Sequence, residues 1–302
     1  MASRKLITVF GATGAQGGAV VRALLGNPEF AVRAVTRNLD GNGAQELKKL
    51  KVEVVKGDTD DKEGLKKILS GAYGCFLVTN YFDHFDKNRE IQQGKNVADA
   101  CKAAGIKHLV FSGLDNTEGS GAAGPVHHLD GKAKIEDYIE QTGVSYTSTR
   151  TSFYNENFLN FNPPRKIGDN KYAISLPMGD KPLYMMAVND VGPWVVEILK
   201  DPAKYKGKKL HLAGDKLTLD QVCDTLSKHL KPKQFQYVPV SVEDFAKMPF
   251  PGAEEMANMF HFFQLKADNF RDVALTRKLY SKTQTFDAWV QANKEKIIQA
   301  LK

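Results

Sequence analysis

The chain has 302 residues, of which 42% are hydrophobic and 25% charged, the usual proportions of a globular protein. These proportions exclude a disordered, collagen-like or coiled-coil chain. No apolar run approaches the ~18–20 residues that a membrane-spanning helix needs, and Lys5–Phe10 already has the pattern of a strand. We therefore expect a cytoplasmic protein without a signal peptide or a membrane-spanning segment.

The charge is basic, with 42 Lys and Arg residues against 35 Asp and Glu residues and a formal net charge of +7. The basic residues are spread along the chain, so a surface that favours anionic ligands explains them better than nucleic-acid binding. The cysteines Cys75, Cys101 and Cys223 are too few and too scattered for a disulfide framework or a zinc site. We expect no metal.

The first 150 residues alternate β-rich runs with helical patterns. Strands are predicted, in chain order, at Lys5–Phe10, Ala31–Thr36, Val52–Lys56, Tyr73–Val78, Lys107–Phe111 and Ser145–Thr149. Helices are predicted at Gln16–Leu25, Gly43–Leu50, Lys62–Leu69, Asp86–Ala104 and Gly131–Gln141. Strands that recur every ~20–30 residues with helices between them are typical of right-handed βαβ units and a parallel sheet.

The pattern changes after Arg150, where prolines and glycines punctuate a loop-rich stretch with short strands. A helix is predicted to begin at Asp190 as its N-cap, and Lys209–Leu212 is predicted to return a strand to the main sheet. We therefore predict an α/β protein whose doubly wound Rossmann domain spans residues 1–150, rejoined by about 188–212. Residues 151–302 are predicted to form a smaller α+β lobe.

A glycine-rich sequence, Gly11-Ala-Thr-Gly-Ala-Gln-Gly17, lies where the first predicted strand meets the first helix. In this position Gly11 allows a tight turn, Gly14 lets backbone amides approach a pyrophosphate, and Gly17 lets helix and sheet pack closely. The alternative, a purely structural turn, is disfavoured by the βαβ units around it. The sequence therefore predicts a dinucleotide site.

The choice between NAD and NADP depends on the end of the second strand. NAD-binding proteins place an Asp or Glu about 20 residues past the glycines, whereas this chain has Arg37 there. A guanidinium suits the 2′-phosphate of NADP through bidentate, charge-assisted bonds. Asp40 lies close by and weakens the argument, and Arg37 could simply be exposed. We predict NADP.

Six motifs extend this pattern along the chain. They are Gly11-Ala-Thr-Gly-Ala-Gln-Gly17, Val35-Thr-Arg-Asn38, Gly57-Asp-Thr-Asp60, Val78-Thr-Asn-Tyr81, Tyr154-Asn-Glu-Asn157 and Gly252-Ala-Glu-Glu-Met-Ala-Asn-Met-Phe260. Together they resemble NmrA-like proteins, which are atypical members of the short-chain dehydrogenase/reductase superfamily. The resemblance covers nearly the whole chain and is greatest to animal members, NADP(H)-responsive regulators of the cytosol and nucleus.

The resemblance implies a role for each position around NADP(H). The pyrophosphate would contact Gly11, Ala12, Thr13, Gly14, Ala15 and Gln16, and the 2′-phosphate Arg37 and Asn38. Asp58 and Thr59 would lie against the adenine, and Thr79, Asn80 and Tyr81 would line the nicotinamide ribose. Lys132 would reach the ribose hydroxyls, and Tyr154, Asn155, Glu156 and Asn157 would close over the nicotinamide.

Catalysis is less well supported. Short-chain reductases use a Tyr-x-x-x-Lys pair, whereas this chain reads His128-Leu-Asp-Gly-Lys132, with histidine in place of tyrosine. Histidine could donate a proton near neutral pH, but a cationic neighbour would keep it neutral. His128 and Lys132 are therefore catalytic candidates only, and the competing interpretation makes Lys132 a ribose ligand.

Two functions remain open. The first is a redox sensor that binds NADP(H), changes conformation or oligomeric state, and so alters its hold on regulatory protein partners. The second is an NADPH-dependent reductase of quinones or related electrophiles, for which the resemblance also provides examples. No helix-turn-helix or zinc pattern supports direct DNA binding, and the resemblance implies a homodimer in the cytoplasm and nucleus.

Overall fold

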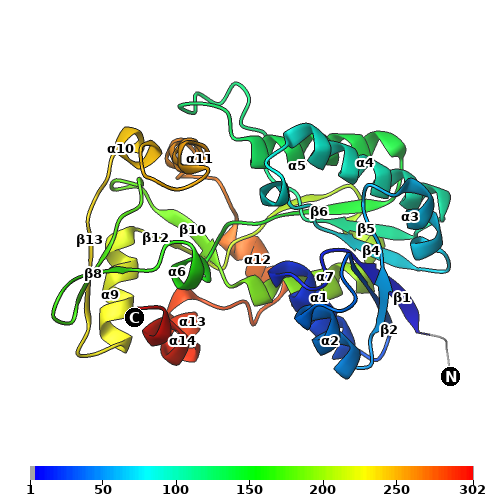
Figure 1. Ribbon diagram of the computed structural model, residues 1–302, viewed down its shortest axis with the longest axis horizontal. Coiled ribbons are helices and arrows are strands. Elements are labelled where there is room, and N and C mark those ends of the chain that lie inside the picture. The colour runs from blue at the N-terminus through cyan, green and yellow to red at the C-terminus, as the bar shows by residue number, and fades with distance from the viewer. Residues whose placement is uncertain (1–3, 302) are drawn as a thin grey trace. The chain divides into compact units, whose positions relative to one another are not determined.

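The computed structural model describes residues 4–301 (Figure 1). The chain divides into two compact units. The first comprises Met1–Asn116, His127–Arg150 and Asn189–Leu210, and the second comprises Thr117–Val126, Thr151–Val188 and His211–Lys302. Within residues 4–301, every helix is too short or too polar to cross a membrane.

The first unit is built on a seven-stranded sheet in the order β11-β6-β5-β4-β1-β2-β3. Its strands are β1 (Lys5–Val9), β2 (Phe30–Thr36), β3 (Glu53–Lys56), β4 (Gly74–Leu77), β5 (His108–Phe111), β6 (Tyr146–Arg150) and β11 (Lys209–His211). The strands from β1 to β6 pair in parallel. Their order is that of a doubly wound dinucleotide-binding sheet, so the predicted fold class is confirmed.

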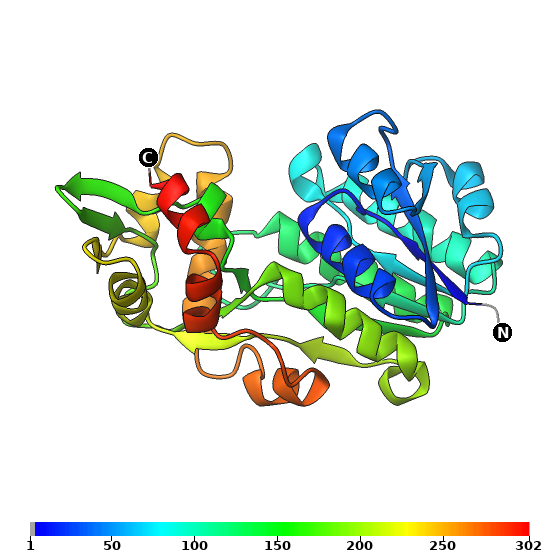
Figure 2. The same cartoon turned by 90° about the horizontal axis from the view of Figure 1, so that it is seen from below.

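Helices cover both faces of this sheet (Figure 1). They are α1 (Ala15–Leu25), α2 (Asn42–Lys49), α3 (Lys62–Leu69), α4 (Lys87–Ala103), α5 (His127–Thr142), α7 (Val191–Lys200) and the short α8 (Pro202–Tyr205). Helix α7 lies along α1 (Figure 2), and Gly192 approaches the backbone of Ala19 so closely that a Cβ would not fit. On the opposite face, α3, α4 and α5 pack together over a buried apolar core.

The predicted start of helix α5 and the predicted N-cap of helix α7 differ from the structure. Helix α5 begins at His127, four residues before the predicted Gly131, because Gly131 does not break the helix. A Cβ at Gly131 would lie 2.8 Å from Glu90 Oε2, so the glycine allows α5 to approach α4. Asp190 precedes α7 as predicted, but within the described chain its side chain caps no first-turn amide, because a short 3-10 turn, Val188–Asp190, leads into the helix.

The second unit contains two three-stranded sheets, ordered β12-β10-β7 and β13-β9-β8. The strands are β7 (Phe153–Tyr154), β8 (Arg165–Gly168), β9 (Lys171–Ile174), β10 (Leu183–Met186), β12 (Asp215–Leu217) and β13 (Gln234–Tyr237). The helices are α6 (Asn157–Asn160), α9 (Leu219–His229), α10 (Val242–Ala246), α11 (Ala253–Leu265), α12 (Val273–Leu279), α13 (Phe286–Ala292) and α14 (Lys294–Ala300). Its core is aromatic: Phe158 packs against Phe153 and Phe286, and Phe286 stacks on Trp289.

Candidate nucleotide-binding site

The turn between β1 and α1 has the geometry of an anion cradle. Gly11 has a φ of 64°, and a Cβ there would lie 2.6 Å from Val78 Cγ1. A Cβ at Gly17 would collide with the carbonyl oxygen of Gly11, so helix and turn can approach only because both residues are glycine. The amide of Gly14 closes the turn with a 2.9 Å bond to Gly11 O. The uncharged first turn of α1 presents the positive end of the helix, which suits a pyrophosphate.

Three groups of predicted residues in the first unit follow the carboxyl ends of neighbouring strands. Arg37 follows β2, Asp58 follows β3, and Thr79 follows β4. Because these strands are parallel, their carboxyl ends meet at one edge of the sheet, where doubly wound folds bind ligands. Ser112, after β5, donates a 2.7 Å hydrogen bond to Gln16 Oε1 and links this edge to the glycine turn.

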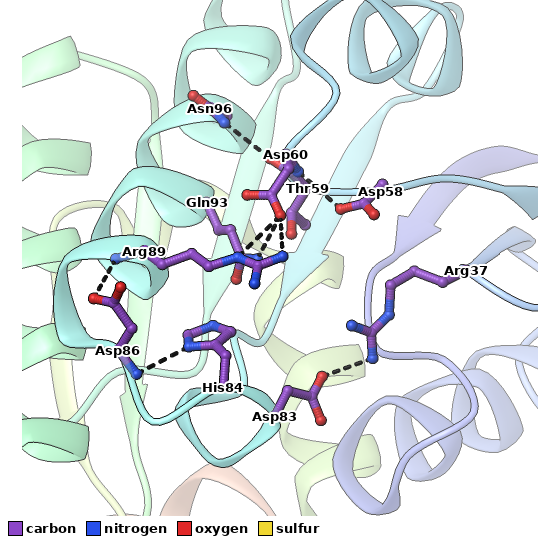
Figure 3. Close-up of polar contacts among 10 residues, drawn as sticks. All are labelled: Arg37, Asp58, Thr59, Asp60, Asp83, His84, Asp86, Arg89, Gln93 and Asn96. Carbon is purple, nitrogen blue, oxygen red and sulfur yellow. Dashed lines mark hydrogen bonds and ion pairs between the residues drawn. The ribbon is translucent and has the colours of Figure 1, made fainter.

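Arg37 is held by a residue that sequence reasoning missed. Its guanidinium donates to Asp83 Oδ2 at 2.6 Å (Figure 3). Asp83 ends the 3-10 turn η1 (Tyr81–Asp83) after β4, and its Oδ1 accepts a 2.7 Å bond from Asn80 Nδ2. Asp83 is the acidic residue nearest to the predicted Thr79–Tyr81 segment along the chain, but the contact between loops could not be predicted from spacing.

Asn38, the second residue predicted at the 2′-phosphate, stabilises the turn that leads into α2. Its Oδ1 accepts from the amides of Asp40 at 3.0 Å and Gly41 at 3.1 Å. This turn fixes the backbone directly after Arg37. The side-chain nitrogen of Asn38 takes no part in either bond.

The predicted adenine residues lie in a braced turn after β3 (Figure 3). Asp58 Oδ1 accepts from the amide of Asp60 at 2.9 Å, and Thr59 O accepts from Asn96 Nδ2 at 2.9 Å. Asp60 accepts from Arg89 at 2.8 Å and from Gln93 at 3.1 Å. Burial raises the pKa of Asp60, but these hydrogen bonds outweigh it and leave the pKa below its ordinary value.

Lys132 lies in a buried ion pair with Glu90, another residue that sequence reasoning missed. Its Nζ donates to Glu90 Oε1 at 2.5 Å, to Thr79 O at 2.8 Å and to Thr79 Oγ1 at 2.9 Å. An ammonium has three donors, so all of them are used, and Glu90 compensates the charge. Glu90 is fully buried, although its neighbours along α4 are mostly polar. The sequence around it therefore does not predict its burial.

His128, the other catalytic candidate, is buried in the first turn of α5. Its ring lies 5.2 Å from the ring of Phe82 and 6.2 Å from that of Tyr81. Phe85 contacts both of these aromatic residues. The histidine therefore packs against the segment that follows β4.

The predicted residues Tyr154–Asn157 belong to the second unit. Tyr154 Oη shares a 3.3 Å hydrogen bond with Thr151 Oγ1, and burial raises the pKa of Tyr154 to about 12. Glu156 accepts from the amide of Val188 and from Trp289 Nε1, each at 3.0 Å. These bonds give the segment a structural role in its own unit, and its predicted closure over the nicotinamide stays a prediction.

Comparison with known proteins gives a consistent result. An Aspergillus campestris NmrA-like family domain-containing oxidoreductase, cpsB, is 33% identical over 286 residues, which cover 87% of this chain and 84% of the relative. The transcriptional regulator NmrA in complex with NADP aligns over 99% of both chains with 25% identity and a TM-score of 0.85. The NADPH-dependent quinone oxidoreductase QOR2 of Escherichia coli aligns over 95% of this chain and 99% of its own, with 26% identity and a TM-score of 0.79. The NmrA-like family itself matches residues 3–290, so the chain belongs to the NmrA-like family.

Proposed function

We propose that this protein binds NADP(H) and acts as a redox-responsive regulator. Cofactor binding changes its conformation or oligomeric state and thereby its affinity for regulatory protein partners. In this proposal the protein forms a homodimer and acts in the cytoplasm and nucleus. The observation that carries the proposal is the combination of a tight glycine turn suited to a dinucleotide with a Lys132 whose charge is compensated by the buried Glu90.

The cofactor part of the proposal rests on the first unit and on the relatives. Gly11 and Gly17 allow the tight turn that would hold a pyrophosphate at the N-terminus of α1, and Arg37, after β2, would bind a 2′-phosphate. Lys132 would hold ribose hydroxyls by replacing one of its two hydrogen bonds to Thr79 with a bond to the ribose, while it keeps its bond to Glu90. NmrA has been crystallised with NADP and with NAD, and QOR2 with NADPH.

The regulatory part rests on the weakness of the catalytic pair. In the Tyr-x-x-x-Lys arrangement the lysine charge lowers the pKa of the proton donor. Here Glu90 compensates that charge, and a histidine packed against Phe82 stands where the tyrosine would be. The residues are therefore arranged to bind a cofactor better than to deliver a proton.

A second function, NADPH-dependent reduction of quinones or related electrophiles, is favoured by the relatives. The Aspergillus campestris protein is named an oxidoreductase and QOR2 a quinone oxidoreductase. When bound, NADPH supplies a hydride, and its transfer to a quinone needs little acid catalysis. The missing tyrosine therefore does not oppose this function as strongly as it opposes carbonyl reduction.

Limited proteolysis with NADPH, with NAD⁺ and without ligand tests the regulatory proposal. We expect NADPH, more than NAD⁺, to change cleavage in the loops after Asn38 and Thr79 and in Tyr154–Asn157. Light scattering on the same samples reports a change of oligomeric state. Identical cleavage and identical mass in all samples, at saturating NADPH, would refute the regulatory proposal.

A further inference from the structure

Arg37 is paired with an acidic group of its own chain at the position where the proposed function needs it for a phosphate. The Arg37–Asp83 bond, at 2.6 Å, joins the loop after β2 to the 3-10 turn after β4 (Figure 3). The Arg37 side chain is 63% exposed and that of Asp83 35% exposed, so an incoming anion can reach the pair. The other oxygen of Asp83 accepts from Asn80 Nδ2 at 2.7 Å, which fixes the carboxylate in place.

A carboxylate and a phosphate use the same guanidinium donors. Both accept parallel, charge-assisted hydrogen bonds from the planar fork of arginine. Asp83 accepts from one guanidinium nitrogen, Nη2, so a 2′-phosphate that binds Arg37 shares a guanidinium whose charge Asp83 already partly compensates. The two anions then lie on one guanidinium and repel each other.

We infer that Asp83 competes with the 2′-phosphate for Arg37 and so sets the preference of this protein between NADP(H) and NAD(H). The inference rests on the proposed cofactor site. NAD(H) has a neutral hydroxyl at the 2′ position and leaves the Arg37–Asp83 pair undisturbed, whereas NADP(H) brings a second anion to the same guanidinium. Asp83 thus lowers the affinity for NADP(H) without lowering that for NAD(H).

The expected size of this effect follows from the exposure of the pair. Exposed ion pairs contribute little, and repulsion between a carboxylate and a phosphate near the surface is moderated by water and salt. Together they predict a change of about three- to tenfold in affinity. The competition tunes the response to NADP(H) concentration and does not prevent binding.

The competition for Arg37 also involves the turn that packs against His128. Asp83 ends the turn that contains Tyr81 and Phe82, and both rings contact His128. A 2′-phosphate on Arg37 weakens the bond between this turn and the loop after β2, whereas the bond of the turn to Asn80 and its ring contacts with His128 remain. The inferred competition therefore links the 2′-phosphate to the candidate catalytic histidine.

Titration calorimetry on the full chain with Asp83→Asn tests the inference. Asparagine keeps an oxygen for Asn80 and removes the negative charge. We expect NADP⁺ and adenosine 2′,5′-bisphosphate to bind about three- to tenfold more tightly than to the wild type, and NAD⁺ and AMP to bind within about twofold. Unchanged or weaker binding of both 2′-phosphorylated ligands would overturn the inference.

Glu63→Gln is the matched control, because it removes one carboxylate from another exposed ion pair, Glu63–Lys66. We expect it to leave all four affinities unchanged. An equal gain in both variants would assign the effect to net charge and overturn the inference. If the wild type binds neither NADP⁺ nor NAD⁺, the proposed cofactor site fails as well. If it binds both and Asp83→Asn leaves their ratio unchanged, only the role of Asp83 fails.

Discussion

His108 shows how strongly one buried residue can couple this fold to pH. It lies on β5, fully buried, with Nδ1 2.9 Å from Ser145 Oγ and Nε2 2.8 Å from Thr147 Oγ1. Burial lowers its pKa to about 4, because an imidazolium there would lose its hydration. The neutral ring is therefore part of the folded state.

This depressed pKa predicts a loss of stability in acid. The contribution of His108 is fully present above its unfolded pKa of about 6.5 and is lost as pH falls towards about 4, because only the unfolded chain binds the proton readily. The loss amounts to about 3 kcal/mol. Urea unfolding at pH 7, 6 and 5 gives the free energy of unfolding at each pH. We expect this free energy to fall less steeply with decreasing pH in His108→Gln than in the wild type. Equal slopes would show that His108 does not cause the acid sensitivity.

The residue scale also shows what sequence could and could not predict. Arg37 was predicted from its spacing past the glycines, whereas Lys132 was predicted from the resemblance to short-chain reductases, whose Tyr-x-x-x-Lys motif reads His128-Leu-Asp-Gly-Lys132 here. Their partners Asp83 and Glu90 were missed because ion pairs between a loop and a loop, or between two helices, follow no sequence spacing. The chemistry of the site depends on these partners, since they determine which donors are available.

At the scale of elements, the shape of the candidate pyrophosphate site depends on how closely α1 packs against the turn that precedes it. The approach depends on Gly17, whose Cβ would meet the backbone of Gly11 and Ala12. Gly26, at the other end of the same helix, has a φ of −73° and would place a Cβ 3.5 Å from its nearest neighbour, Ala23 O. Both glycines belong to the same helix, but only Gly26 has space for a methyl group.

We expect Gly17→Ala to destabilise the protein by about 1–3 kcal/mol, because backbone must move to admit the methyl group. It should also weaken NADP⁺ binding, since the displaced turn forms the pyrophosphate cradle. Gly26→Ala is the control and should change the free energy of unfolding by less than about 1 kcal/mol, with binding unchanged. Thermal unfolding and calorimetry measure both variants, and equal effects would contradict the assigned role of Gly17.

The order of elements was predictable because βαβ periodicity is a local property. The strands predicted in the first 150 residues are confirmed, and Lys209–Leu212 does return a strand to the sheet. The start of α5 was misplaced because Gly131 serves a contact with another helix, which no local pattern reports.

At the scale of the whole molecule, the first unit is assembled from three stretches of chain and the second from the remaining three. The predicted cofactor residues fall in both, with Tyr154–Asn157 in the second unit and the others in the first. A ligand shifts a conformational equilibrium only through different affinities for its states, so the proposed regulation requires that NADP(H) bind one conformation of these residues more tightly than another.

The most direct test of the central claim measures NADPH binding and NADPH oxidation on one preparation, with a panel of quinones and aldehydes. We expect saturable binding of NADPH without efficient turnover, and His128→Ala should change neither, because Lys132 is committed to Glu90 and no proton donor is required. Efficient, saturable oxidation of NADPH would contradict this account and identify a reductase, and a loss of about 10²-fold or more in His128→Ala, with binding retained, would assign the proton transfer to His128.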